Sequence, residues 1–547
     1  MVSTSAVVVG PAATADGGVP ARAAQDPQAA GGRWYDRRAA GPWIVIGLGV
    51  LSAWVLTAGI QTPWPWSDEG ATYIALQRTW SQLAVLFQSP DAPIVPYYYV
   101  AKAWATVVQA LWPAISTVVA VRLLSAAAAT ATVLVLYAIV ARNAGRLLGV
   151  LSALVLLSLP GFDRYAQEAR TYALLALAAT VSWLLCDRRL RPNEIRPARP
   201  VRRLAAAGGH ALSLAAVATI HTFGLFQWVA QAVEVLSAPG TSRARRRRTA
   251  SLASVIVIAA MLTAAQFITS ATYGTGPPGA AGTRVVTPVS TLAQFVRGIS
   301  VSTQPLVSLA ALVLVAVGAF SRPGGRRTFP RSLLVWLLVP LTLEIALGVV
   351  RTNLFRLRYW IAFLPPFAAL AALGMVAVAT SIVRLVSGGR AARATTLIVL
   401  GLLGVQVVAA LPTQLQIRTA DGHNQDLTKV LAVLARTRAK YPDLVPVIAD
   451  HSAVGMLAAA DPPLLAENPL MQLDPSARSV YTTAMPSRVV RRRLAGSHDL
   501  LWIYQGQLNT AEAPHRLPRA LAQLHPAVVW ATPAGTTWTT LLLRTGP

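Results

Sequence analysis

Two adjacent carboxylates and several arginines are the residues of this chain whose types suit a chemical reaction. Asp68 and Glu69 lie in WPWSDEGATY at 64–73, shortly after a long apolar run. A carboxylate can take a proton from an attacking hydroxyl, and the planar fork of an arginine can bind two phosphate oxygens. Together these residue types suit a group transfer in which a phosphate departs. For this chemistry the fold must place the carboxylates and the arginines side by side.

The composition is that of an integral membrane protein. Of the 547 residues, 54% are hydrophobic and 13% charged, with a mean hydropathy of +0.51, whereas soluble domains carry roughly 25% charged residues. The net charge of +27 comes from basic clusters between apolar runs, a positive-inside pattern rather than a nucleic-acid-binding surface. A single cysteine, Cys186, excludes an internal disulfide and a multi-cysteine metal site.

Apolar runs predict eleven transmembrane helices in a membrane domain over 42–412, given that a crossing helix needs about 20 residues. With the N-terminus in the cytoplasm, the arginine-rich connections all lie on the cytoplasmic side of the cell membrane, as the charge rule requires. This topology requires 95–112 to be an amphipathic helix at the interface. The predicted spans are 43–60, 118–141, 147–159, 171–186, 204–220, 223–236, 252–271, 301–320, 332–350, 359–383 and 395–411.

The remaining segments have other expected roles. Residues 1–41, rich in Ala, Gly and Pro, are expected to form a disordered cytosolic tail. The first outer loop, 61–117, is expected to hold two surface helices, near 71–87 and 97–112. The Gly- and Pro-rich outer loop 272–300 is long enough to be a lid.

Beyond residue 412 the pattern changes from long apolar runs to short ones. LVPVIAD, DLLWIYQG, AVVWAT and TTWTTLLLRT have the composition of strands, and NQDLTKVLAVLARTRAKY that of an amphipathic helix. We therefore expect residues 413–547 to form a small extracytoplasmic α/β domain.

The polar residues predicted to face outside gather at helix ends. Ionisable groups at membrane depth are costly and usually mark a substrate path. Acids on one loop and basic residues on others suit a base together with cations that stabilise a leaving phosphate. These residues include Asp68, Glu69, Asp91, Lys102, Glu168, Arg170, His221 and Arg358.

Each of these residues also has a structural interpretation. Ser67 or Asp68 can be a helix N-cap, and Glu168 or Asp163 can neutralise Arg164 or Arg170 in an interfacial salt bridge. His221 can be a satisfied histidine at a span end. Tyr97 and Tyr98 can be interfacial aromatic anchors. These interpretations leave unexplained why all the sites share one side of the membrane.

Six segments in this order resemble a known family. They are WSDEGATY, DAPIVPYYYVAKAW, VRLLSAAAATATVLVLYAIVAR, PGFDRYAQEARTYALLAL, IHTFGLFQWVAQ and RLRYWIAFLPPFAALAALGM, within residues 43–385. They are similar to segments of the GT-C superfamily of polyprenyl-phosphate-sugar-dependent glycosyltransferases. The resembling branch contains protein O-mannosyltransferases, the lipid A aminoarabinose transferase and actinobacterial mannosyl- or arabinosyltransferase-like proteins.

The resemblance implies roles for single residues. Asp68 matches the family's catalytic base, with Glu69 beside it, and Arg170 matches an arginine expected to face the cavity. Residues implied to bind the donor phosphate are Arg170, Arg358, Tyr359 and Lys102. Residues implied to line the cavity are Glu168, His221, Asp91, Tyr97 and Tyr98.

One position departs from the family's pattern. Many relatives carry a histidine where this chain has Ile94 or a neighbour, so no metal or acceptor role is carried over for that position. No cofactor is assigned with certainty. The sequence leaves open whether Asp68 and Glu69 hold a divalent metal together with substrate phosphates.

The expected reaction moves a sugar, mannose or arabinose first, from a polyprenyl-phosphate donor within the membrane lipids. The acceptor would be an envelope glycan, lipid or protein on the outer face. Asp68 would deprotonate the acceptor hydroxyl, which attacks the anomeric carbon with inversion. Two alternatives are a transporter or flippase of lipid-linked sugar and a non-catalytic scaffold for envelope assembly. Sugar transfer that depends on Asp68 separates the enzyme from both.

Overall fold

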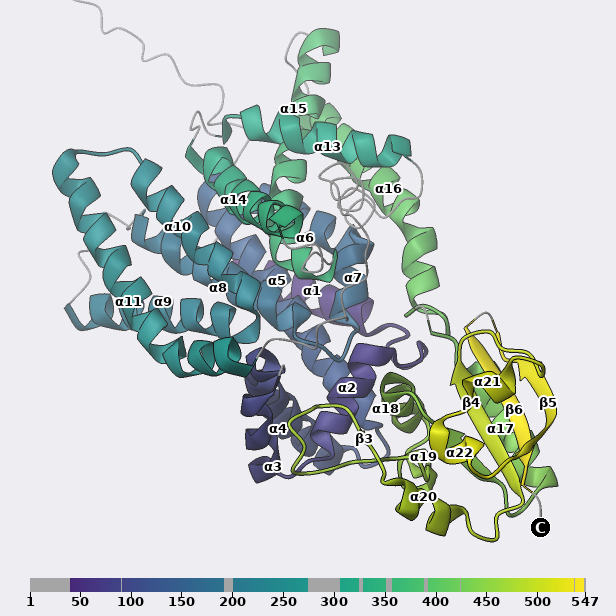
Figure 1. Ribbon diagram of the computed structural model, residues 1–547. Coiled ribbons are helices and arrows are strands. Elements are labelled where there is room, and N and C mark those ends of the chain that lie inside the picture. Colours follow the sequence, from purple (N-terminus) through teal and green to yellow (C-terminus); the bar gives the residue numbers. More distant parts are fainter. Residues whose placement is uncertain are drawn as a thin grey trace, which may run out of the picture.

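The computed structural model describes residues 40–89, 91–190, 200–273, 305–323, 328–350, 357–387, 392–423, 425–535 and 537–545. The chain is mostly helical, with a large helical bundle and a smaller sheet-containing part beside it (Figure 1). The predicted tail over 1–41 and lid loop over 272–300 lie almost wholly outside the described residues.

Each of the eleven predicted spans overlaps a helix. These helices are α1 (Ala40–Thr57), α5 (Thr117–Ala144), α6 (Arg146–Ser158), α8 (Tyr172–Leu190), α9 (Pro200–Ile220), α10 (Leu225–Ser237), α11 (Ser242–Tyr273), α13 (Pro305–Phe320), α14 (Thr328–Val350), α15 (Leu364–Ser387) and α16 (Ala392–Ile417). The apolar runs therefore predicted the positions of the helices correctly.

Fewer of these helices are long and apolar enough to cross a membrane. Within the described ranges five meet this condition, and a sixth is obtained if α6 and α7 (Pro160–Ala166), bent by 70°, count as one span. The five are Thr117–Ala144, Ser242–Thr269, Thr328–Leu347, Arg358–Val386 and Ala392–Ile417. The chain is thus a multi-pass membrane protein with five or six clear candidate spans. This number is lower than the eleven predicted, because several of the predicted runs are shorter than a crossing requires.

The helix α15 lies at the centre of the bundle. Its candidate span is 83% buried, and α13, α14, α6 and α16 pack against it. Gly318 of α13 and Gly374 of α15 lie at the closest crossing, where a Cβ on either glycine would come within 1.9 Å of a carbonyl oxygen of the other helix. Small residues thus let the two helix backbones touch.

The segment 61–117, predicted to be the first outer loop, forms three helices, α2 (Ser67–Leu76), α3 (Trp80–Val85) and α4 (Val95–Leu111), together with the short 3-10 turns η2 (Leu86–Gln88) and η3 (Ala92–Ile94). The single helix expected over 71–87 is interrupted, because the Thr79 hydroxyl accepts a hydrogen bond from the Gln82 N–H and caps α3. All residues of α2 from Glu69 to Leu76 are buried. The helix α2 is therefore covered by other parts of the protein, while its predicted position at the membrane surface stays a prediction.

The C-terminal part contains a four-stranded mixed sheet with the strand order β1-β4-β6-β5. The strands β1 (Val445–Ile448) and β4 (Asp499–Gln505) are parallel, whereas β6 (Trp538–Arg544) is antiparallel to β4 and to β5 (Ala527–Pro533). Each of the four strand-like runs of the sequence contains one of these strands. The strands β2 (Met471–Gln472) and β3 (Thr483–Ala484) form a second, small sheet.

Helices surround these sheets, and one of them contacts the bundle side of the molecule. They are α17 (Thr428–Lys440), α18 (His451–Ala460), α19 (Pro463–Glu467), α20 (Ser487–Leu494), α21 (Ala513–Arg516) and α22 (Arg519–Ala522). The helix α18 packs against α2 (Figure 1), where a Cβ on Gly70 would lie 2.6 Å from the carbonyl carbon of Gly455. The backbones of the two parts are therefore in direct contact.

A buried arginine also joins the two parts. Arg78, fully buried after α2, donates hydrogen bonds to the carbonyls of Pro475 (3.0 Å), Ala477 (3.3 Å) and Ser479 (2.7 Å). Three carbonyls satisfy most of its donors, which a buried guanidinium needs. The segment 475–479 between β2 and β3 is thereby held against the first outer loop.

Candidate active site

Asp68 lies where several elements of the bundle meet. Its Oδ2 atom is 3.1 Å from Arg358 Nη1 and 3.8 Å from Arg170 Nη2, and it accepts a hydrogen bond of 3.2 Å from the Tyr172 hydroxyl. Arg358 comes from the turn η6 (Leu357–Phe363) before α15, Arg170 from the loop between α7 and α8, and Tyr172 from the start of α8. The structure thus brings together side chains from three segments that are far apart in the sequence, around residues 68, 170–172 and 358.

The two arginines are held in different ways. Arg170 is buried, and its Nη1 donates to the Asp68 carbonyl at 3.3 Å and the Thr72 hydroxyl at 3.4 Å. Arg358 is about a quarter exposed and lies against the rings of Trp66, Tyr359 and Tyr172, at 5.2, 5.7 and 6.0 Å from their centroids. Two guanidiniums thus face the Asp68 carboxylate, and such a pair also suits the oxygens of a phosphate.

Glu69, next in the chain, has a different environment. Its Oε1 accepts hydrogen bonds from Arg122 Nε and from the Ala169 N–H, both at 2.8 Å. Its Oε2 is 2.7 Å from Arg122 Nη2 and 3.2 Å from His423 Nδ1. Burial alone would raise the pKa of Glu69, but the charges and hydrogen bonds of Arg122 and His423 lower this pKa well below its usual value. Both oxygens are thus occupied, and the geometry favours a structural role.

Glu168 is fully buried and forms an ion pair with Arg164, with 2.8 Å between Arg164 Nε and Glu168 Oε1. Burial raises the pKa of Glu168 to about 7, although the charge of Arg164 opposes this shift. The salt bridge weighed for this segment is therefore present. Asp163 instead pairs with Arg418, at 2.6 Å from its Nη1.

The aromatic and acidic residues of the predicted cavity lie around Arg170. Tyr97 and Tyr98 are buried on α4 with their ring centroids 5.9 Å apart, and the charge of Arg170 acts on both. Burial raises the pKa of Asp91, while Arg170 and a hydrogen bond from the Val480 backbone oppose the shift. These three residues and Arg170 therefore form one cluster.

His221 lies against Tyr359, the residue that follows Arg358, with the two ring centroids 4.3 Å apart. Its Nδ1 accepts a hydrogen bond from the Phe223 N–H at the start of η4 (Thr222–Gly224). Burial lowers the pKa of His221 to about 3, and the nearby charges of Arg170 and Arg358 add to this effect. The imidazole is therefore neutral near pH 7.

Lys102 is the predicted phosphate ligand that the structure does not bring to this cluster. Its Nζ donates a hydrogen bond of 2.7 Å to the Leu76 carbonyl and lies 5.6 Å from the centre of the Trp80 ring. Leu76 is at the far end of α2 from Asp68, about 12 Å along the helix axis. The contacts of Lys102 favour a role in capping α2.

Several residues of the site were not found from the sequence. Arg122 lies within the apolar run of α5, and His423 follows α16, so neither has a local signal. Tyr481 comes from the segment between β2 and β3. Burial raises the pKa of Tyr481, with Asp68 and Asp91 adding to the shift and Arg170 and Arg358 opposing it. The C-terminal part therefore contributes a phenol within reach of the charges of the cluster.

The acids of the site do not form a metal-ligand group on their own. In the part of the chain that the structure describes, no three His, Cys, Asp or Glu side chains come together in a way that could hold a metal ion.

Comparisons with known proteins agree with this architecture. No protein family and no curated protein matches the chain by sequence. Its structure is similar to that of ArnT from Cupriavidus metallidurans in the apo state, with a TM-score of 0.55 and 14% identity over 93% of this chain and 100% of that one. The same protein bound to undecaprenyl phosphate gives a TM-score of 0.53 and 13% identity with the same coverage.

An archaeal enzyme shows the same likeness. The oligosaccharyltransferase of Archaeoglobus fulgidus, tethered with an acceptor peptide, matches with a TM-score of 0.50 and 12% identity, over 87% of this chain and 70% of that one. The chain therefore has a GT-C-like fold, as the six segments predicted. At these identities the likeness is one of fold and does not distinguish a mannosyl- or arabinosyltransferase-like branch.

Proposed function

We propose that the protein is an inverting glycosyltransferase that moves a sugar from a polyprenyl phosphate to an acceptor hydroxyl on the outer face of the membrane. The observation that carries this proposal is the convergence of Arg170 and Arg358 on the partly exposed carboxylate of Asp68. The cluster lies at the end of a multi-pass bundle whose fold is shared with such enzymes. A base beside two phosphate-binding cations is what the reaction requires.

The proposed mechanism starts with an exchange of partners. The donor phosphate takes the place of Asp68 as the partner of Arg358, whose aromatic surroundings keep the guanidinium in place. The freed carboxylate of Asp68 then accepts the proton of the acceptor hydroxyl. The acceptor oxygen bonds to the anomeric carbon, the bond from that carbon to the phosphate oxygen breaks, and the negative charge passes to the phosphate between Arg170 and Arg358.

The surrounding residues suit a sugar. Aromatic rings such as those of Tyr359 and His221 offer flat apolar faces, and Asp91 offers acceptors for sugar hydroxyls. Within the described residues the buried Tyr97 hydroxyl has no hydrogen-bond partner, so a sugar hydroxyl would satisfy it. Mannose and arabinose are the proposed sugars, and an envelope glycan, lipid or protein is the proposed acceptor. The extracytoplasmic domain over 413–547 would help to bind the acceptor.

The test is sugar transfer from radiolabelled decaprenyl-phosphate mannose and decaprenyl-phosphate arabinose into membrane acceptors. The wild type is compared with Asp68→Asn and with Asp443→Asn, a matched change at an exposed aspartate of the C-terminal part. Loss of the base should slow transfer by about 10²- to 10⁴-fold, whereas Asp443→Asn should leave it unchanged. Equal transfer by all three proteins contradicts the proposed base. Movement of labelled lipid across liposomes without transfer would favour the transporter.

A further inference from the structure

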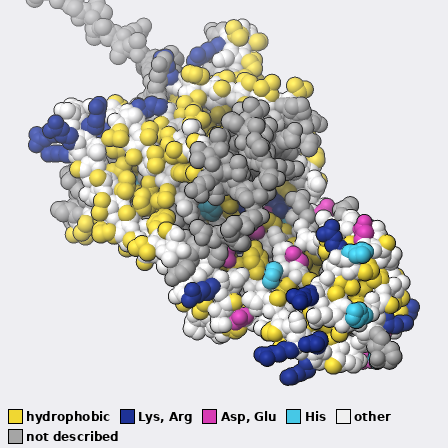
Figure 2. All heavy atoms as spheres, in the orientation of Figure 1, with side chains coloured by type: hydrophobic (Ala, Val, Ile, Leu, Met, Phe, Trp, Pro, Cys, Tyr) yellow, Lys and Arg dark blue, Asp and Glu magenta, His cyan; other side chains and the backbone are white. Residues whose placement is uncertain are grey.

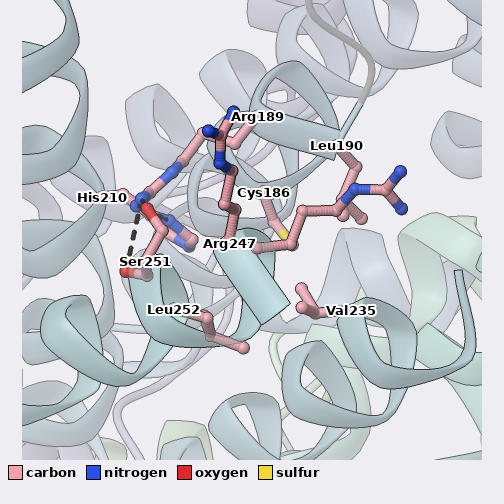
Figure 3. Close-up of a pocket in the computed structure, with 9 residues that line it drawn as sticks. Cys186, Arg189, Leu190, His210, Val235, Arg247, Ser251 and Leu252 are labelled. Atoms are coloured by element: carbon pink, nitrogen blue, oxygen red, sulfur yellow. Dashed lines mark hydrogen bonds between the residues drawn. The ribbon is translucent and has the colours of Figure 1, made fainter. Parts of the chain in front are cut away.

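A cavity with several arginines in its lining lies at the opposite end of α8 from Asp68. It has a volume of about 210 Å³ and lies between the C-terminal ends of α8 and α10, the middle of α9 and the first turns of α11. Figure 3 shows Arg189, His210 and Ser251 together on one side and the apolar Val235 and Leu252 on another. Arg247 and Arg248 of α11 complete the lining. The cavity thus combines three guanidiniums with an apolar floor.

The charge around this cavity is mainly positive among the residues that the structure describes. Among the described residues no carboxylate forms an ion pair with Arg189, Arg247 or Arg248. The nearby acids have other partners, since Asp187 is 3.5 Å from Arg142 and Glu234 is 3.9 Å from Arg331. Arg248 donates a hydrogen bond of 3.0 Å to the Pro239 carbonyl, and Arg247 is exposed. Neutral groups and solvent thus surround these charges, and an anion at the cavity would reduce their mutual repulsion.

Neutral groups hold the inner arginine in place. The Nη1 atom of Arg189 lies 3.2 Å from His210 Nδ1. The Nη2 atom of Arg189 donates to the Ser251 carbonyl at 3.3 Å and to the Ser251 hydroxyl. His210 is buried, and its Nε2 lies 2.7 Å from Gln231 Oε1. Because Nδ1 accepts from Arg189, Nε2 donates to Gln231, and this network fixes the guanidinium at the cavity without neutralising it.

The depth of the cavity fits the head groups of a lipid leaflet. Arg189 lies 17 residues after Tyr172, or about 26 Å along the axis of α8, which is close to the hydrocarbon thickness of about 30 Å. The faces of α10 and α11 beside the cavity expose apolar side chains such as Leu236 (53%) and Val257 (55%). Figure 2 shows a basic cluster at the turn between these helices, at the edge of a broad hydrophobic face.

We infer that this cavity binds a phosphate group, which an anionic phospholipid of the inner leaflet supplies. Arginine forks bind the phosphate oxygens, and a basic pocket between transmembrane helices on the cytoplasmic side suits such a head group. The acyl chains lie along the exposed apolar faces of α10 and α11. This inference is independent of sugar transfer, because the cavity and the Asp68 cluster are at opposite ends of α8.

The experiment uses the full-length protein, purified and delipidated in a neutral detergent. Its thermal unfolding midpoint is followed by tryptophan fluorescence during titration with phosphatidylglycerol, phosphatidylcholine or inorganic phosphate. The pocket variant is R247Q/R248Q. The control variant is R245Q/R246Q, which removes the same charge from the same turn at exposed residues that do not line the cavity.

Phosphatidylglycerol should stabilise the wild type and the control variant at similar concentrations, and the pocket variant should need about ten times more. Stabilisation by inorganic phosphate alone, lost in the pocket variant, would support the phosphate site and assign it to a soluble ligand. Equal effects of phosphatidylglycerol and phosphatidylcholine, or equal losses in the two variants, would overturn the inference. If R247Q/R248Q affects folding, the same titration is carried out with Arg189→Gln, which changes the inner arginine of the cavity.

Discussion

Glu69 Oε2 and Arg122 Nη2 lie 2.7 Å apart in an ion pair that is buried on both sides, while the preceding residue, Asp68, is partly exposed and faces Arg358. Consecutive residues on a helix point about 100° apart, so two adjacent carboxylates serve two environments. This difference gives a prediction for each of them.

The change Glu69→Gln should mainly reduce stability. It leaves Arg122 buried without its counter-ion, which costs about 3–5 kcal/mol in the free energy of unfolding. Asp68→Asn should leave the thermal unfolding midpoint nearly unchanged and slow transfer by about 10²- to 10⁴-fold. Thermal unfolding of both variants in detergent checks the pair. If Glu69→Gln has the stability of the wild type and still loses transfer, Glu69 belongs to the chemistry.

The change Arg358→Lys should weaken donor binding. Lysine keeps the charge but loses the planar fork and the stacking on Trp66 and Tyr359, so the KM for the donor should rise about tenfold with a smaller change in the KM for the acceptor. The same change at Arg436, an exposed residue of α17, should alter neither constant. An unchanged donor KM in Arg358→Lys would contradict the phosphate-binding role.

Glu168 should make stability depend on pH between about 4.5 and 7. Its pKa is about 7 in the folded protein because of burial, against 4.5 for an ordinary glutamate. The folded state therefore binds more protons in this window, and stability falls as the pH rises through it, by about 3 kcal/mol in all. The midpoints of the wild type and Glu168→Gln, measured at pH 5 and pH 7.5, should diverge towards the higher pH. Parallel changes would show that Glu168 ionises as it does in the unfolded chain.

The change Tyr481→Phe should affect the reaction without affecting the fold. The phenol lies near the charges of Asp68 and Arg170, and loss of one hydrogen bond to substrate should raise the acceptor KM up to about tenfold. Tyr504→Phe, in β4 on the sheet, is the matched control. Transfer kinetics with unfolding midpoints separate the two effects, and identical kinetics in both variants would remove Tyr481 from the site.

The sequence was informative where a signal is local or follows chain order. Apolar runs predicted the helices, and the motifs around Asp68, Arg170 and Arg358 predicted three residues that do meet. It was not informative where a partner comes from a distant segment. Arg122 and His423 distinguish Glu69 from Asp68, yet one lies in an apolar run and the other beyond the last predicted span. The contact of Lys102 with the Leu76 carbonyl likewise carries no sequence signal.

The carbonyls that bind Arg78 have a consequence for how the protein is made. They begin 397 residues further along the chain, at Pro475, so the guanidinium has no such partners while most of the polypeptide is still on the ribosome. The segment that follows α2 can therefore reach its final packing only after nearly the whole chain has been made. A protein truncated before residue 475 would lack these three carbonyls, and Arg78 would be left without them.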